Sequence, residues 1–341
     1  MPIVMQGGDF MEIGKLPNDV LERLVISNIK NKREEVLVGA AIGLDSAIID
    51  YGPDVCVMST DPITGATKGL GSLAIHISCN DVSTSGAEPI GVLLTILAPP
   101  DTSEGDIESI MKEAAVAAQE VNIEIMGGHT EITDAVNRIV ISTTVVGKQK
   151  KKDLPKIDEV REGDKLLITK YAGIEGTSIL ARELESKLKD IMGEEKLNEA
   201  KNMDSMLSVV KEGIICGKIG VRYMHDITEG GVFGAVWETS KAIGKGIRIE
   251  EDAIPVKDFT REIAHILGID LYRLISSGSM IIVAGEDKLE EIQDTLSKNN
   301  IKSTVIGEVG GEKVLLEKNG QIVEIGAPAS DELYKALRFN K

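Results

Sequence analysis

Cysteines are few in this 341-residue chain, and none of its apolar segments is long. The three cysteines, Cys56, Cys79 and Cys216, are odd in number and widely spaced, which argues against a disulfide framework or a zinc site. Reduced, buried thiols are typical of a cytoplasmic protein. No apolar stretch reaches the ~18 residues that a membrane span needs, and the first residues lack the basic and apolar regions of a signal peptide. We therefore expect a cytoplasmic protein that does not cross a membrane.

Basic residues are also in short supply. Lys and Arg total 38 against 55 Asp and Glu, so the net charge is −17. Because no basic block offsets this charge, we expect the chain to repel nucleic acid and anionic lipid. A small anionic ligand would therefore need a local device, such as a metal ion, a helix N-terminus or a cluster of backbone N–H groups.

Several motifs of well-known enzyme classes are missing. The chain has no GxxxxGK[ST], no GxGxxG in a βαβ unit, no GxSxG and no CxxC. These absences argue against a P-loop protein, a dinucleotide-binding domain, a serine hydrolase and a dithiol redox enzyme. Aromatic residues make up only 3%, so the core must be built from Ile, Val, Leu, Ala and Met.

The length of the chain predicts two domains, because a single core rarely grows beyond 250–300 residues or so. Residues 1–11 are expected to form a flexible extension, and Met11 is a possible alternative start. The charged stretch "KQKKKDLPKIDEVREGD" interrupts the pattern, which places a domain boundary near residue 150. We therefore predict an N-terminal domain at 12–150 and a C-terminal domain at 151–341.

The N-terminal domain alternates strands with two helices, expected at 68–85 and 103–122. Some strands follow each other directly, which favours an α+β sheet covered on one face by helices. The C-terminal domain repeats strands and helices and is expected to be a second α/β unit of similar size.

Asp81 stands where the 68–85 helix is expected to be apolar. It lies four residues after Ile77, on the same stripe as Leu73. A carboxylate buried there must be paired, capped or bound to a metal ion, because an unpaired buried charge is costly. The alternative is that the helix ends before Asp81 and leaves it exposed.

Two further carboxylates lie at the ends of predicted elements. Asp45 lies in the glycine-rich loop "GAAIGLDSA", and Asp61 ends a strand in "STDP". Each alone is also common in ordinary turns. Together with Asp81, they are suited to Mg²⁺, which proteins hold with few carboxylates plus substrate phosphates.

The stretch "EIMGGHTEIT" at 124–133 is predicted to be a turn that leaves a strand and faces phosphate. Gly127 and Gly128 would allow the backbone to approach a ligand closely, and Thr130 can donate its hydroxyl to a phosphate. His129 is a candidate metal ligand or proton donor, or else an ordinary polar loop residue. Glu131 is likewise either a site residue or an ordinary polar loop residue.

Two glycine-rich stretches are predicted to open helices in the second half. In "HDITEGGVFGAVWE", Asp226 closes a strand and Gly230 and Gly231 precede a helix. In "KYAGIEGTSILA", Gly173 and Gly176 do the same. The free N–H groups at such helix starts either form an anion pocket or belong to simple turns.

Taken together, and in their order along the chain, these stretches resemble the aminoimidazole ribonucleotide (AIR) synthase-like superfamily over about residues 12–338. "GLDSAII" is similar to the family's "GDDAAV" loop, "STDPIT" to its "TDS" strand end, and "HISCNDVSTSGAEP" to its "VNDLAAMGA-P" helix. "GGHTE" stands where the family has "GGDT" or "GGET". The "TEGGV" helix start and the "IEGTSILA" turn resemble the hydrogenase maturation factor HypE most.

The resemblance implies a two-domain α+β and α/β fold, a homodimer whose N-terminal sheets join as a barrel, and ATP with Mg²⁺ bound near the dimer interface. It also implies site residues. Contacts to nucleotide would come from Asp45, Thr60, Asp61, Asn80, Asp81, Gly127, Gly128 and Thr130. The metal would be held by Asp45, Asp61 and Asp81. His129, Glu131 and Asp226 would be catalytic and face a small-molecule acceptor.

The chain departs from the family pattern at three places. Leu44 replaces the first acid of the paired "DD", His129 replaces the acid of "GGDT", and the tail "LYKALRFNK" lacks the C-terminal cysteine on which the maturation factor acts. Three hypotheses follow. The chain is an ATP-dependent enzyme that activates an oxygen of a small acceptor by phosphoryl transfer. Alternatively, it performs the maturation reaction on a cysteine carried by a maturation partner protein. The third hypothesis is a non-catalytic nucleotide-binding or assembly protein.

Overall fold

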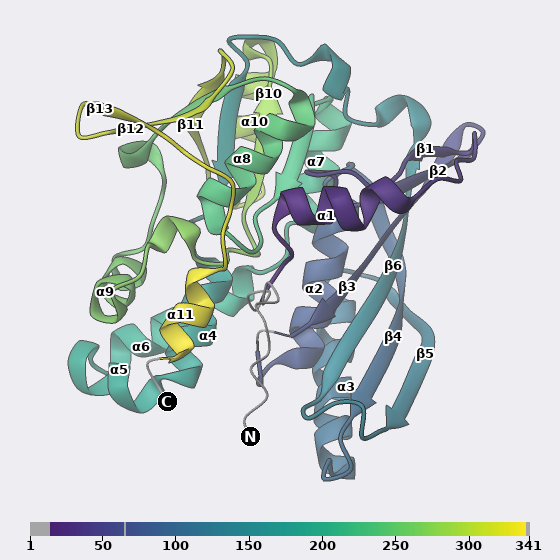
Figure 1. The fold of residues 1–341 in the computed structure, drawn as a ribbon, viewed down its shortest axis with the longest axis vertical. Helices are drawn as coiled ribbons and strands as arrows, with labels where there is room; N and C mark the ends of the chain where they lie inside the picture. Colours follow the sequence, from purple (N-terminus) through teal and green to yellow (C-terminus); the bar gives the residue numbers. More distant parts are fainter. Residues whose placement is uncertain (1–13, 65, 339–341) are drawn as a thin grey trace, which may run out of the picture.

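The structure, a computed structural model, describes residues 14–64 and 66–338. Figure 1 shows two β-sheets with their own helices, and the predicted extension at 1–11 lies outside the described residues. The last strand of the first sheet ends at Lys150 and the first strand of the second sheet begins at Lys165. The predicted two-part mixed α/β architecture is confirmed.

The first sheet has six strands in the order β1-β2-β3-β6-β4-β5. Only β4 and β5 pair in parallel, and all other neighbours are antiparallel. Its strands are β1 (Val36–Val38), β2 (Ala47–Tyr51), β3 (Asp54–Ile63), β4 (Glu88–Ala98), β5 (Glu124–Ile132) and β6 (Val140–Lys150). The short helix α1 (Asn18–Leu24) precedes them.

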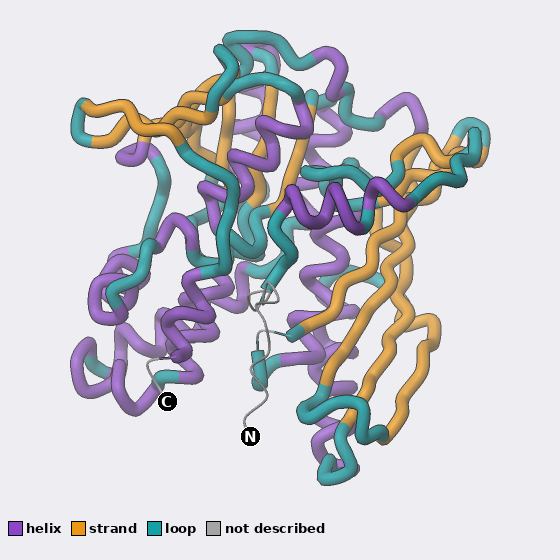
Figure 2. The backbone as a smooth tube through the Cα atoms, in the orientation of Figure 1, coloured by secondary structure: helices purple, strands orange, loops and turns teal. Residues whose placement is uncertain are grey.

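Two helices cover one face of this sheet (Figure 2). Helix α2 (Leu70–Ser83) packs against β3 and β6, and α3 (Glu104–Glu120) packs against α2. Ser103 begins α3 with a capping box, because its side chain accepts from the backbone N–H of Asp106 and the Asp106 carboxylate accepts in return. Since α2 runs beyond Asp81 and leaves it only 5% exposed, the alternative that the helix ends earlier is excluded.

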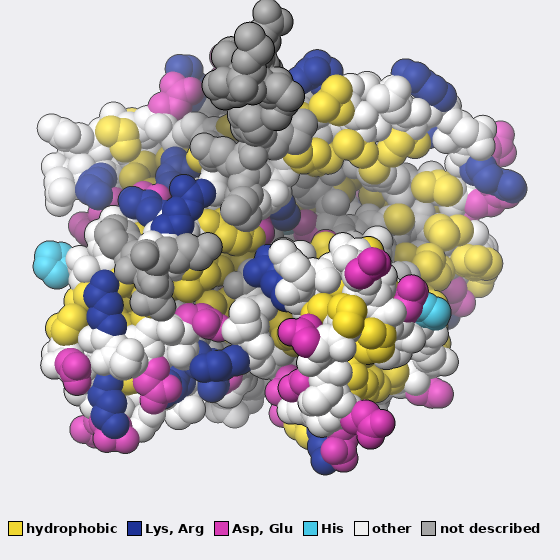
Figure 3. Space-filling view, turned by 60° about the horizontal axis from the view of Figure 1, so that its bottom comes forward, with side chains coloured by type: hydrophobic (Ala, Val, Ile, Leu, Met, Phe, Trp, Pro, Cys, Tyr) yellow, Lys and Arg dark blue, Asp and Glu magenta, His cyan; other side chains and the backbone are white. Residues whose placement is uncertain are grey.

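No helix among the described residues covers the other face of the first sheet. Ile90 and Leu93 of β4 and Met126 of β5 are 42%, 43% and 46% exposed. Hydrophobic side chains gather on this half of the molecule in Figure 3, at the upper right. The outer face of the sheet is therefore an open apolar surface.

The second sheet has seven strands in the order β13-β12-β9-β11-β7-β10-β8, and only β12 and β9 pair in parallel. The strands are β7 (Lys165–Thr169), β8 (Tyr223–Asp226), β9 (Ile247–Glu250), β10 (Met280–Ala284), β11 (Ser303–Val309), β12 (Val314–Lys318) and β13 (Gln321–Glu324). Its helices are α4 (Ile174–Glu183), α5 (Glu185–Met192), α6 (Glu194–Lys201), α7 (Val210–Ile219), α8 (Gly231–Ile243), α9 (Asp258–Leu267), α10 (Glu286–Lys298) and α11 (Glu332–Arg338).

Six 3-10 turns complete the described elements: η1 (Ile26–Asn28), η2 (Lys151–Asp153), η3 (Ile157–Glu159), η4 (Asn202–Met206), η5 (Glu251–Ala253) and η6 (Leu271–Arg273). None of the helices in the described part of the chain is long and apolar enough to cross a membrane.

The two halves are joined where α2 meets the start of α7. Asn80 donates from Nδ2 to the Leu207 carbonyl at 2.8 Å and accepts at Oδ1 from the Val209 N–H at 2.8 Å. Gly213 of α7 lies so close to α2 that a Cβ there would be 2.2 Å from the Ser83 carbonyl oxygen. This close contact holds both halves at a fixed distance around the cavity described next.

Candidate active site

A cavity of about 490 Å³ lies between the two halves. It is lined by the segment 14–21, the loop 41–45, the end of β3, one face of α2, the segment 225–229 before α8, Glu238 within α8 and the first residues of α11. The predicted site residues Asp45, Thr60, Asp61, Asp81 and Asp226 all line it. Segments as far apart in sequence as Gly14 and Tyr334 therefore build one site.

Four of these residues are aspartates. The pKa values of three of them, Asp61, Asp81 and Asp226, are raised. Burial and the charges of neighbouring carboxylates raise the pKa of Asp81 well above its usual value, although Ser59 donates a hydrogen bond to it at 2.6 Å. Burial also raises the pKa of Asp61. Burial and the Asp45 charge raise the pKa of Asp226 to about 8. The site thus gathers negative charge that has no full compensation from the protein itself.

Asp226 carries the clearest sign of a missing partner. It is 1% exposed, and neither of its carboxylate oxygens has a hydrogen-bond partner among the described residues. Ligand atoms of Asp45, His225 and Asp226 all lie within 4.8 Å of one another, close enough to share one metal ion. Because buried carboxylates are otherwise paired or bound to metal, the carboxylates of Asp45 and Asp226 fit a divalent cation such as Mg²⁺, which prefers oxygen ligands.

His225 is a site residue that the sequence analysis did not single out. Its Nδ1 lies 2.8 Å from Asp45 Oδ2, and its Nε2 lies 3.1 Å from Glu238 Oε2. Burial lowers the pKa of this imidazole, but the two carboxylates prevail and raise it well above its usual value. A protonated His225 therefore donates to both carboxylates and fixes the orientation of Asp45.

Lys15 is a second residue of the cavity that the sequence analysis did not single out. Its backbone N–H donates to Glu229 Oε2 at 2.9 Å, and its Nζ donates to Thr228 Oγ1 at 3.2 Å. Desolvation lowers the pKa of Lys15, but the carboxylates of Glu238, Asp61 and others around it outweigh this and raise the pKa above its ordinary value. Lys15 is thus a permanent cation at the edge of an acidic cavity.

The predicted phosphate-facing turn at 124–133 is wrong as a turn. Residues 127–131 lie within the edge strand β5, and none of them lines the cavity. His129 Nε2 lies 3.2 Å from Glu131 Oε2, and these side chains are 65% and 53% exposed. Gly128 is required for strand pairing, because a Cβ there would lie 1.8 Å from the Leu94 carbonyl oxygen of β4. Within one chain, Gly127, Gly128, His129, Thr130 and Glu131 therefore do not meet the four aspartates.

Asn80 lies at the contact between the two halves. Both ends of its amide are used in the contact between α2 and the segment before α7, and it does not line the cavity. The structure thus gives Asn80 a structural role, and its predicted contact with nucleotide stays a prediction. Thr60 does line the cavity, while its hydroxyl donates to the Thr143 carbonyl at 2.8 Å.

Both glycine-opened helices are present, but Gly176, which was predicted to precede its helix, lies within α4. Gly173 precedes α4 with φ +72°, and Gly230 precedes α8 with φ +85°. At α8, however, the Gly230 N–H already donates to Asp331 Oδ2 at 2.7 Å. The start of α8 therefore holds a carboxylate of the chain itself in the place predicted for an external anion.

Comparison with known proteins gives matches over most of the chain. Residues 43–149 match the family model of the AIR synthase related protein N-terminal domain, and residues 161–316 match that of the C-terminal domain. A putative hydrogenase expression/formation protein of Methanocaldococcus jannaschii is 28% identical over 300 residues, covering 84% of each protein. Carbamoyl dehydratase HypE of Escherichia coli is 27% identical over 259 residues, covering 73% of each.

Solved structures have the same fold. The structure of a HypE–HypF complex matches with a TM-score of 0.75 and 22% identity, over 91% of this chain and 99% of that chain. Hydrogenase maturation protein HypE in complex with ATP matches with a TM-score of 0.71 and 22% identity, over 96% of this chain and 98% of that chain.

Proposed function

The chain belongs to the AIR synthase related protein family, as its motifs predicted, and we propose that it is an ATP-dependent enzyme of the hydrogenase-maturation type. The observation that carries this proposal is the convergence of Asp45, Asp61, Asp81 and Asp226 on one cavity, with both oxygens of Asp226 unpartnered among the described residues. Carboxylates gathered in this way suit Mg²⁺ that bridges to nucleotide phosphates. The ATP complex of a similarly folded relative supports the same ligand.

The aspartates would hold Mg²⁺: carboxylate oxygens of Asp45 and Asp226 lie within 4.8 Å of each other, and Asp61 and Asp81 line the same cavity. Bound Mg²⁺ would neutralise charge on the phosphates and on the phosphoryl group as it is transferred to an oxygen of the acceptor. His225 keeps Asp45 in place through its hydrogen bond. Lys15 offers an ammonium group at the same cavity, where it would contact a phosphate.

A homodimer would bring residues 127–131 of β5, which do not line the cavity of their own chain, to the cavity of the partner subunit. The outer face of the first sheet is apolar and exposed, which favours its burial against a second copy. In such a dimer, Gly127, Gly128 and Thr130 would contact the phosphates bound by the partner subunit, with His129 and Glu131 beside them. This keeps their proposed roles although they do not meet the aspartates within one chain.

The second candidate function is the maturation reaction. The positions of the cysteines favour it only if the acceptor thiol belongs to another protein. Cys79 and Cys216 are buried, and neither they nor Cys56 line the cavity. A thiol acceptor would therefore have to be carried by a maturation partner protein. The HypE–HypF complex supports a partner protein, because there a protein of this fold is bound to a second protein.

Isothermal titration with ATP, with and without Mg²⁺, tests the proposal, followed by identification of the recovered nucleotide. We expect Mg²⁺-dependent binding and slow conversion of ATP to ADP. Lack of binding at millimolar ATP would contradict the proposal. It would favour the alternative that Leu44 and His129 have disabled the site and left a non-catalytic assembly protein.

A further inference from the structure

Lys170, the residue that follows β7, places its ammonium group among oxygen atoms inside the protein. Its side chain is 12% exposed, and Nζ lies 2.7 Å from Oε1 of Glu212, whose side chain is 2% exposed. The same ammonium donates to the carbonyls of Met206 at 3.0 Å and Ser208 at 2.6 Å. All three donors of the ammonium thus have an oxygen to meet. Two carbonyls and a carboxylate would also suit a free monovalent cation, because carbonyl oxygens can replace its water shell.

The backbone at Lys170 is held in an unusual conformation. Its φ angle is +55°, in the left-handed region that long side chains rarely adopt. Its N–H donates to the Lys302 carbonyl at 2.8 Å. Strained residues persist where the surrounding contacts over-determine them, and they gather at functional positions. The conformation therefore points to a requirement for the ammonium at this place.

The carbonyls that bind the ammonium belong to the segment 206–209, which leads from η4 into α7. Lys170 contacts residues 206 and 208 of this segment, and Asn80 of the first half contacts residues 207 and 209. Gly278 packs against it too, since a Cβ there would lie 2.6 Å from the carbonyl oxygen of residue 206. The first half is thus attached to a segment whose own place depends on Lys170.

Both sides of this attachment continue into the first cavity, which contains the four aspartates. Asn80 precedes Asp81 and Gly278 follows Ser277, and Asp81 and Ser277 line that cavity from the two halves. Burial, and next the charge of Asp226, raise the pKa of Asp81, so the two carboxylates are neighbours across the junction. A shift of the segment 206–209 would therefore change the distance between them.

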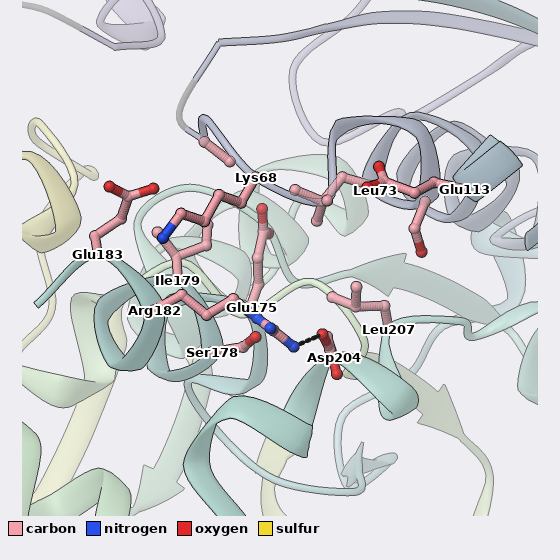
Figure 4. Close-up of a pocket in the computed structure, with 13 residues that line it drawn as sticks. Lys68, Leu73, Glu113, Glu175, Ser178, Ile179, Arg182, Glu183, Asp204 and Leu207 are labelled. Carbon is pink, nitrogen blue, oxygen red and sulfur yellow. Dashed lines mark hydrogen bonds and ion pairs between the residues drawn. The ribbon is translucent and has the colours of Figure 1, made fainter. Parts of the chain in front are cut away.

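The segment also contributes directly to a second cavity, of about 370 Å³. Figure 4 shows Leu207 and Asp204 among the residues that line it. The first turn of α2 and one face of α4 complete much of the wall, so both halves build this cavity as well. Lys170 itself lines neither cavity, and it acts on them only through the segment that it holds.

We propose that Lys170 is a positioning residue whose ammonium acts as a built-in monovalent cation. It fixes the segment 206–209, and through that segment it sets the distance between Asp81 of the first half and Asp226 of the second. This inference rests on the proposed function, because only a metal–nucleotide complex between the halves makes that distance matter for ligand binding.

Lys170→Met tests the site, since it removes the ammonium and keeps an apolar side chain of similar reach. The melting temperature should fall, because the buried carboxylate of Glu212 loses its partner. Ammonium chloride should then raise the melting temperature by several degrees more than tetramethylammonium chloride at the same concentration, because only the smaller cation fits among the three oxygens. The wild type, which carries its own ammonium, should melt equally in the two salts.

The affinity for Mg·ATP, measured by isothermal titration well below the melting temperature, tests the positioning role. In tetramethylammonium chloride, Lys170→Met should bind about tenfold more weakly than the wild type, and ammonium chloride should restore most of the affinity. Lys165→Met is the matched control. Lys165 begins the same strand, pairs with Glu308 at side-chain exposures of 27% and 52%, and lines neither cavity. Its substitution should produce neither cation effect.

A double variant keeps the test decisive if Lys170→Met does not fold. Lys170→Met combined with Glu212→Gln removes both charges, which buried pairs tolerate better than the loss of one partner. It should bind Mg·ATP about tenfold more weakly than the wild type in either salt, because the carboxylate that would attract ammonium is gone.

The outcomes separate this inference from the proposed function. Identical behaviour of Lys170→Met in the two salts would overturn the inference, and so would wild-type affinity for Mg·ATP in the double variant. A cation effect on the melting of Lys170→Met, together with no binding of Mg·ATP by the wild type, would confirm the cation site and contradict the proposed function instead.

Discussion

At the residue scale, the site depends on carboxylates that the folded chain does not neutralise. Asp81 sits on the buried face of α2 with a single hydroxyl donor, Ser59. Asp226 has no hydrogen-bond partner in the described chain. Such groups lower the stability of the metal-free protein, and they are retained where binding of a cation requires them.

Replacing Asp81 by Asn should therefore have opposite effects on stability and activity. The melting temperature of the metal-free protein should rise by a few degrees, because burial raises the pKa of the Asp81 carboxyl well above its usual value, and an amide at this place is neutral without having to take up a proton. Conversion of Mg·ATP to ADP should fall by about 100-fold or more, because the metal loses a charged neighbour. Scanning calorimetry and an ADP assay on the same preparation check both effects.

Asp54→Asn is the control for this change. Asp54 lies on the exposed part of β3, where it pairs with Lys150 and lines neither cavity. Its substitution should leave turnover unchanged. If Asp81→Asn lowers the melting temperature and keeps full turnover, Asp81 is a structural residue and not part of the metal site.

At the scale of elements, Asp331 joins three segments of the C-terminal half. It accepts from the N–H of Gly230 at 2.7 Å, of Ile275 at 3.1 Å and of Leu333 at 2.8 Å. The first of these opens α8, and the last begins α11. Asp331 thus attaches the C-terminal helix to the wall of the first cavity, which Leu333 also lines.

Asp331→Asn should lower the free energy of unfolding by about 1–3 kcal/mol, because an amide NH₂ cannot accept from the Gly230 N–H and leaves it unsatisfied. Urea denaturation measures this loss. Glu324→Gln is the control and should change the stability little, because the Glu324 side chain is 54% exposed and pairs with Lys313 at the surface. Equal stability of the two variants would mean that α11 is held by apolar packing alone.

The elements show which predictions a sequence permits. The helix around Asp81 was predictable because its apolar residues recur at helical spacing, so that one carboxylate on the stripe stands out. The "GGHTE" stretch was predicted as a turn because glycine pairs usually mark one. In the structure Gly128 instead permits close pairing of β5 with β4. Lys15 could not be predicted as a site residue from the sequence, because its hydrogen-bond partner Thr228 lies 213 residues away.

At the scale of the whole molecule, stability should depend on pH in a direction set by the buried acids. The pKa of Asp226 is raised to about 8 and that of Glu175 to about 7, both through burial first. In the range between their ordinary and raised values, the folded state binds protons that the unfolded state has released. The stabilisation is therefore complete below about pH 4 and is lost as the pH rises through 7 to 8.

The metal-free protein should accordingly melt at lower temperature at pH 8.5 than at pH 5.5. Added Mg²⁺ should raise the melting temperature more at pH 8.5, where the carboxylates are already ionised and no protons need be displaced. Thermal melts at both pH values, with Mg²⁺ or with EDTA, test this. Asp226→Asn should flatten the pH dependence, and a Mg²⁺ effect that is equal at both pH values would contradict a carboxylate site.

The open face of the first sheet leads to a prediction about assembly. Leu93→Glu should give a monomer, because it places a charge in the surface proposed to pair with a second copy, where Leu93 is 43% exposed. Ile322→Glu on β13 is the matched control, since Ile322 is 56% exposed on the other sheet and should leave the assembly unchanged. Analytical ultracentrifugation distinguishes the two outcomes. A monomeric wild type would remove the route by which β5 could reach an aspartate site.

A mixing experiment tests whether each site is built from two chains. Asp81→Asn disables the cavity of its own chain, and Glu131→Gln would disable the cavity of the partner subunit. In a mixed dimer, the chain with Glu131→Gln keeps its own Asp81 and receives an intact Glu131 from the other chain, so one of the two sites is complete. Equal mixing, with exchange of subunits, should restore about a quarter of wild-type ADP formation, since half of the dimers are mixed and half of their sites work. If each site were contained in one chain, the mixture would be no more active than its two parents, and the exposed His129–Glu131 pair on β5 would have no part in the reaction.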